Sequence, residues 1–242
     1  MVTYMQTVLG PLWLFINPLL TGVTYVILFG NIAKLSTDGI PQLLFYLSGN
    51  AIWSFFSHCV VKNASTFTNN AALFGKVYFP RLVMPVSCVL GNIILFLIQM
   101  LLVLALLFWY AWQGAVHPLW RAWIFLPLLL LQLGIMGMGI GIIISSLTTK
   151  YRDLSILVDF GMTLWMYATP VVYPLSAVNP ELRRLLLLNP VTPIAELYRR
   201  ILLGAGEFSY GPFLYSLVFS IAAGLFGILI FNRIERNFVD TV

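Results

Sequence analysis

Charged residues are scarce in this sequence: 9% of its 242 residues are Asp, Glu, Lys or Arg, whereas 60% are hydrophobic. Soluble domains carry roughly 25% charged residues, and no fold in water hides so much apolar surface. The scarcity excludes soluble, disordered and nucleic-acid-binding proteins, so we predict no nucleic-acid partner.

Cysteine and histidine are rare as well. Two cysteines, Cys59 and Cys88, are too few for a secreted disulfide framework, and we interpret both as buried thiols. His58 and His117 belong to no metal-ligand motif, so we interpret them as interfacial or packing residues. We therefore predict no metal, no cofactor and no catalytic residue in this chain.

The sequence contains long runs without a charged residue, at residues 1–33, 39–61, 82–120, 122–149, 160–180 and 208–232. A bilayer-spanning helix needs about 20 mostly apolar residues, and continuous runs exclude a period-two β-barrel pattern. We predict an all-α polytopic membrane protein with a single domain over residues 1–242. Its six transmembrane helices are expected at about 12–33, 42–60, 83–110, 122–148, 155–173 and 211–232.

Basic residues indicate the orientation of these spans. Six spans place both termini on one side, and cytosolic short loops carry an excess of Lys and Arg. Lys34 and Arg121 are the basic residues of the short loops on the other side. With cytosolic termini, the inner loops and the C-terminal tail hold Lys62, Lys76, Arg81, Lys150, Arg152, Arg233 and Arg236. We predict cytosolic termini, with residues 174–210 as an outer segment.

The loop of residues 62–81 has the pattern of a short amphipathic helix. Phe67, Ala71 and Phe74 share one helix face, and Gly75 fits the stop position. Such a helix lies either on lipid headgroups or against a protein partner. Its polar face carries amides and hydroxyls rather than lysines, which favours the protein partner.

The outer segment predicts two short amphipathic helices that enter the outer leaflet and return. Asn179-Pro180 and Thr192-Pro193 are helix-start patterns, and Gly204 is a stop. By spacing, Glu196 pairs with Arg199 and Arg200 on the face opposite the apolar one, at Ile194, Leu197, Tyr198, Ile201 and Leu202.

Three further features leave alternatives open. Asp159, the only acid inside a predicted span, either faces a polar channel or pairs with Lys150 or Arg152. Gly137 and Gly141 form a close-packing pattern, within the subunit or across a dimer. Aromatic residues at the predicted outer ends form an interfacial belt or a stacking surface for sugar rings; the candidates for a substrate path are Trp109, Tyr110, Trp165, Tyr167 and Tyr173.

Several motifs resemble the membrane subunits of bacterial polysaccharide-export ABC transporters, the ABC-2 class. They run in order through almost the whole chain: residues 9–13 (LGPLW), 17–20 (NPLL), 29–30 (FG), 75–81 (GKVYFPR), 150–153 (KYRD), 169–174 (TPVVYP) and 188–190 (LNP). The motifs at 76–81 and 150–153 are the most specific.

The resemblance implies a permease subunit that exports lipid-linked O-antigen, capsule or teichoic acid across the bacterial cytoplasmic membrane. It implies a homodimer, two cytosolic ABC ATPase subunits that bind ATP and Mg²⁺, and contact with membrane lipid. A coupling helix and a second contact after the fourth span would touch the ATPase, through Phe67, Asn70, Phe74, Lys76, Tyr78, Arg81, Lys150, Arg152 and Asp153.

The start of the chain departs from this family pattern. Family members usually begin with an amphipathic cytosolic helix and a basic stretch, whereas residues 2–6 read VTYMQ. We expect this helix to be missing or shortened. Export of a lipid or drug is an alternative with the same fold. A membrane-embedded enzyme of lipid-linked sugars lacks a positioned acid or metal site, and a channel or secondary carrier lacks midplane charges.

Overall fold

The computed structural model describes residues 12–66, 82–148 and 154–239. These residues form helices and connecting turns and contain no strand, which confirms the predicted all-α class. The helices are α1 (Trp13–Tyr25), η3 (Val26–Ile32), α2 (Gln42–Ala64), α5 (Val83–Trp112), η4 (Trp120–Phe125), α6 (Leu126–Thr148), α7 (Leu154–Tyr167), η5 (Leu175–Ala177), α8 (Pro180–Leu188), α9 (Val191–Leu203) and α10 (Tyr210–Val239).

Four stretches of helix in the described residues are long and apolar enough to cross a membrane. They are Trp13–Ile32, Val83–Trp112, Trp120–Thr148 and Tyr210–Arg233. Each coincides with a predicted span, so the chain is a multi-pass membrane protein. The two other predicted spans fall on α2 and α7, which do not meet these criteria, and their passage through the bilayer stays a prediction.

Helix α7 is shorter than the span predicted at 155–173, because it ends at Tyr167. Pro170 has no N–H for a helical hydrogen bond and disfavours helical backbone at the residue before it. The Thr169 hydroxyl donates instead to the Trp165 carbonyl oxygen at 2.9 Å. The chain then turns toward α8.

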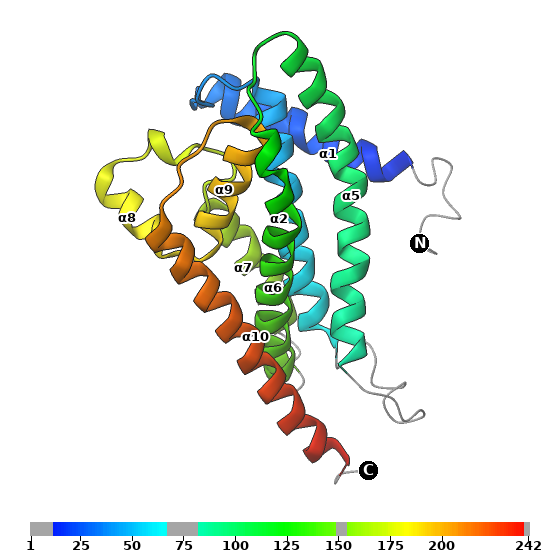
Figure 1. Ribbon diagram of the computed structural model, residues 1–242. Helices are drawn as coiled ribbons and strands as arrows, with labels where there is room; N and C mark the ends of the chain where they lie inside the picture. Colours follow the sequence, from blue (N-terminus) through cyan, green and yellow to red (C-terminus); the bar gives the residue numbers. More distant parts are fainter. Residues whose placement is uncertain (1–11, 67–81, 149–153, 240–242) are drawn as a thin grey trace.

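Helix α2 lies at the centre of the subunit (Figure 1). It contacts α1, α5, α6, α7 and α9, and most of its residues are buried, including Phe45, Tyr46 and Phe56. A helix covered by protein does not need the continuous apolar surface that a lipid-facing helix needs. This position explains why α2 is less apolar than these four stretches.

Glycines allow α6 to pack closely on both neighbouring helices. A Cβ at Gly141 would lie 2.5 Å from the Asn63 Cβ of α2, and a Cβ at Gly139 would overlap the Ala223 carbonyl oxygen of α10. Of the two interpretations left open for Gly137 and Gly141, the described contacts are those of packing within the subunit, since Gly137 also faces Cys59 of α2.

Helix α1 packs against the first half of α2 and crosses it obliquely (Figure 1). Gly22 of α1 faces Leu47, and Gly30 of the following helix η3 faces Gln42 near the start of α2. The second half of α2 therefore has no cover from α1 along the side that also faces α5.

Candidate functional site

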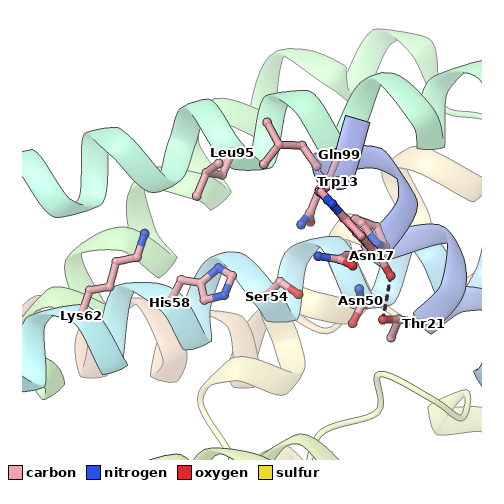
Figure 2. Close-up of a pocket in the computed structure, with 11 residues that line it drawn as sticks. Trp13, Asn17, Thr21, Asn50, Ser54, His58, Lys62, Leu95 and Gln99 are labelled. Carbon is pink, nitrogen blue, oxygen red and sulfur yellow. Dashed lines mark hydrogen bonds between the residues drawn. The ribbon is translucent and has the colours of Figure 1, made fainter. Parts of the chain in front are cut away.

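Helix α2 carries a stripe of polar residues along one face. Asn50, Ser54, His58 and Lys62 are spaced four residues apart, so their side chains lie one above another. Figure 2 shows all four directed to the same side of the helix. His58 and Lys62 are exposed, although α2 is otherwise largely buried.

The stripe lines a cavity of about 540 Å³ between α1, α2 and α5. Helix α1 closes one end with Trp13, Asn17 and Thr21, and α5 adds Leu95 and Gln99 (Figure 2). Lys62 lies at the end away from α1. The described lining therefore combines amide and hydroxyl groups with an indole, an imidazole, an ammonium group and the apolar side chains of Leu14, Pro18 and Leu95.

Lys62 is positioned by a neighbour on α5. The Lys62 ammonium donates to Asn92 Oδ1 at 2.7 Å, and Asn92 is 1% exposed. Asn92 Nδ2 lies 3.7 Å from Cys59 Sγ, a weak hydrogen bond that orients the amide. The contact joins α2 to α5 at the Lys62 end of the cavity.

Sequence reasoning missed this cavity. His58, which the sequence indicates as an interfacial or packing residue, lines the cavity and is exposed. The four-residue spacing of Asn50, Ser54, His58 and Lys62 was a usable signal. Asn17 and Gln99 had no comparable signal, because their proximity to α2 depends on how the helices pack.

The residues predicted to contact an ATPase lie outside the described residues. These are Phe67, Asn70, Phe74, Lys76, Tyr78, Arg81, Lys150, Arg152 and Asp153. The helix ends that precede the two segments are nevertheless in contact, because the Thr148 hydroxyl of α6 donates to the Ala64 carbonyl oxygen of α2 at 2.9 Å. The two predicted contact segments thus begin at neighbouring points.

The structure divides the predicted aromatic path into two groups. Tyr167 and Tyr173 lie together, since the Tyr173 hydroxyl donates to the Tyr167 carbonyl oxygen at 3.0 Å. Trp165 lies two residues before the end of α7. Trp165 is fixed by Asn189, whose Oδ1 accepts from Nε1 at 3.0 Å.

The second aromatic group lies at the end of α5. Trp109 packs against Trp112 with ring centres 6.3 Å apart, and Tyr110 neighbours them in the same helix turn. None of the five predicted aromatic residues is among the described residues that line the cavity, whereas Trp13 is.

Residues 174–210, predicted to lie on the outer side, form two short helices, as predicted, but their ion pair is buried. Glu196 and Arg199 are 2.7 Å apart with side chains 3% exposed each, whereas Arg200 is exposed. The sequence placed this pair on the polar face, which is wrong because α2 and the 168–175 turn cover it. Arg199 donates to the Pro170 carbonyl oxygen at 2.7 Å and lies 4.3 Å from the ring centre of Phe45.

The charges of this pair compensate each other. Burial raises the pKa of the Glu196 carboxyl, and the nearby Arg199 guanidinium partly offsets that rise. Glu196 Oε2 also accepts from the Glu207 backbone N–H at 3.0 Å. The pair therefore joins α9 to the loops on both sides of it.

The start of α9 also differs from the prediction. The helix begins at Val191 rather than after Thr192, and its N-cap is Pro190, which makes no side-chain cap. The Val191 N–H instead donates to Asn189 Oδ1 at 3.1 Å. Gly204 ends the helix in the left-handed conformation at φ 76°, as predicted.

Asp159 lies on the exposed side of α7. No ion pair of Asp159 occurs among the residues that the structure describes, and its two predicted partners, Lys150 and Arg152, lie outside them. The alternative of a polar path beside α7 stays a prediction.

The sequence matches the ABC-2 type transporter family over residues 1–203. A Klebsiella pneumoniae protein named O-antigen export system permease protein RfbA is 29% identical over 99% of this chain and 90% of its own length. A Myxococcus xanthus protein of the same name is 34% identical over 82% of this chain and 74% of its own length. The similarity therefore extends through the helices that form the cavity and into the outer segment.

Proposed function

We propose that this chain, which belongs to the ABC-2 type transporter family, is the membrane permease subunit of an exporter for lipid-linked polysaccharide of the O-antigen, capsule or teichoic-acid type. The observation that carries the proposal is its similarity, over most of both chains, to proteins named O-antigen export permeases.

The complete transporter would contain further subunits. A permease supplies a path but no energy, so we expect two copies of this subunit and two cytosolic ABC ATPases that bind ATP and Mg²⁺. The helix ends joined by Thr148 and Ala64 support one shared docking region, because both predicted contact segments follow directly from them. The assembly would lie in the bacterial cytoplasmic membrane with both termini in the cytosol.

The cavity suits a glycan chemically. Sugar hydroxyls donate and accept hydrogen bonds, and the amides of Asn17, Asn50 and Gln99 can do both. The Trp13 indole offers a flat apolar face at the α1 end. A drug or simple lipid would leave these polar groups unpaired, which disfavours the alternative cargo.

Substitutions in the predicted coupling helix test the function. In cells that lack the native permease, Phe67→Asp or Phe74→Asp should abolish export of the polysaccharide, because a carboxylate would replace an apolar contact with the ATPase. Export is measured as glycan at the cell surface, and membrane insertion as the amount of intact protein in the membrane fraction.

Phe67→Leu is the matched control, since it keeps an apolar side chain and should retain export. Unchanged export by both Asp variants would contradict the coupling role. A permease that restores drug resistance but no surface glycan would support the alternative cargo.

A further inference from the structure

The cavity between α1, α2 and α5 has one charged end. Among the described residues that line it, Lys62 carries the one formal charge, and His58 lies one turn away on the same face of α2. No carboxylate lines the cavity in this part of the chain. A cavity that contains a cation and no anion favours a negatively charged ligand.

The ammonium group of Lys62 is held in place without being neutralised. Asn92 Oδ1 accepts one of its hydrogen bonds at 2.7 Å, and a lysine ammonium has three donors. The Asn92 amide is uncharged and buried, so it fixes the position of the cation and leaves its charge uncompensated. Two donors remain for a ligand.

We propose that Lys62, positioned by Asn92 and accompanied by His58, binds the phosphate group of a membrane lipid. Two sources share this chemistry: the bilayer phospholipids and a phosphorylated carrier lipid to which the glycan is attached. The second source rests on the proposed function. It also uses the whole cavity, because neutral groups from Ser54 to Asn17 continue from the cation toward α1.

The dimensions and the location of the cavity agree with this assignment. Lys62 and Asn50 are separated by about 18 Å along the helix axis, at 1.5 Å per residue, which accommodates a phosphate and the first sugars attached to it. The Lys62–Asn92 contact also joins α2 and α5, the helices on either side of the predicted coupling segment. A phosphate at Lys62 would bind next to the region where the ATPase is expected.

Binding of a polyprenyl diphosphate to the purified full chain in neutral detergent tests the proposal. We expect Lys62→Gln to weaken binding about tenfold or more, because one charge-assisted hydrogen bond is lost. Lys62→Arg should retain binding. Arg121→Gln removes an exposed cation of η4 outside the cavity and should have no effect.

Asn92→Asp provides a second variant that keeps Lys62. Its carboxylate would stand beside the ammonium and compensate the charge, so diphosphate binding should again weaken about tenfold. Size-exclusion chromatography of each variant checks that the protein is folded.

Competing lipids distinguish the two sources of phosphate. If phosphatidylglycerol displaces the diphosphate at equal concentration, the site is one for bilayer phospholipid; if the diphosphate binds more tightly, the site is one for the carrier lipid. Both results support the phosphate site, provided that Lys62→Gln abolishes the preference for phosphate over an uncharged polyprenol.

Equal binding of polyprenol and polyprenyl diphosphate to the native chain would overturn the proposal, as would unchanged binding by both Lys62→Gln and Asn92→Asp. If the native chain binds the diphosphate but supports no glycan export in cells, the proposed function alone is contradicted. If the native chain supports export but does not prefer the diphosphate over polyprenol, this site alone is contradicted.

Discussion

Arg199 is a cation buried in residues 174–210, the segment predicted to lie on the outer side. Several partners replace the water that it loses on burial. It pairs with Glu196, donates to the carbonyl oxygen of Pro170 and lies over the ring of Phe45. These contacts come from three different parts of the chain. A single side chain thus holds the outer helices against α2.

Removing one member of this pair should be costly. Arg199→Ala leaves the Glu196 carboxylate buried and unpaired, and we expect a loss of about 3–5 kcal/mol in stability. Thermal unfolding of the purified protein in detergent measures the change. Arg200→Ala, on the exposed side of the same helix, is the control and should shift the midpoint little.

The double variant Glu196→Gln, Arg199→Met distinguishes the effect of an unpaired buried charge from the effect of lost side-chain packing. It removes both charges, so its stability should lie well above that of Arg199→Ala. If Arg199→Ala and Arg200→Ala unfold at the same temperature, the pair has no structural role.

Helix spacing correctly paired Glu196 with Arg199 but gave the wrong environment. The i, i+3 relation is local and can be read from the sequence. Which face is covered depends on Phe45 and the 170–171 turn, which are distant in sequence. The same limit applies to His58, whose exposure results from the arrangement of α1 and α5 around α2.

Helix α6 packs closely against α2 on one side and α10 on the other. Gly141 faces α2, and Gly139 faces the backbone of α10 at Ala223 and Gly227. Backbone atoms cannot rotate away as a flexible side chain can, so added volume there forces the helices apart. The glycines of this helix therefore determine how closely three helices approach.

Gly139→Ala should destabilise the protein by about 1–3 kcal/mol, because the new methyl group overlaps the Ala223 carbonyl. Gly91→Ala in α5 is the matched control. Nothing lies within 4 Å of a Cβ at Gly91, so that variant should be neutral or more stable by up to about 1 kcal/mol. Unfolding midpoints in detergent compare the two, and equal midpoints would show that α10 accommodates the methyl group.

The residues at which helices begin and end could be predicted from neighbouring residues in the sequence. The position of each helix in the subunit could not. Gly204 ends α9, and Pro180 begins α8, as the sequence predicted. Helix α2 is predicted as a span, and the structure adds that it is the central helix with a polar face on a cavity. The polar spacing in α2 could have been noticed, although its purpose depends on neighbouring helices.

At the scale of the whole molecule, the cavity and the outer segment belong to different parts of the subunit. Figure 1 shows α8 and α9 to one side of the long helices and α5 on the other. The cavity is lined by residues of α1, α2 and α5. The orientation in the membrane decides which of these parts meets the cytosol. Basic residues in the short loops predict that the segment after α2 is cytosolic.

Cysteine labelling tests this orientation in a variant with Cys59→Ala and Cys88→Ala. A reagent that cannot cross the membrane should label Glu181→Cys on exposed α8 in intact spheroplasts. Asn70→Cys should react only after permeabilisation. The reverse pattern would place the termini outside.

Composition and hydropathy alone determined that this protein is an all-helical, multi-pass membrane protein, and its motifs indicated the transporter family. These properties depend on short stretches of chain, because a single apolar run suffices to define a helix in a bilayer. The tertiary structure decided the cavity, the position of Lys62 beside Asn92 and the burial of Arg199. Each of these joins residues far apart in sequence, and only the packing of whole helices brings them together.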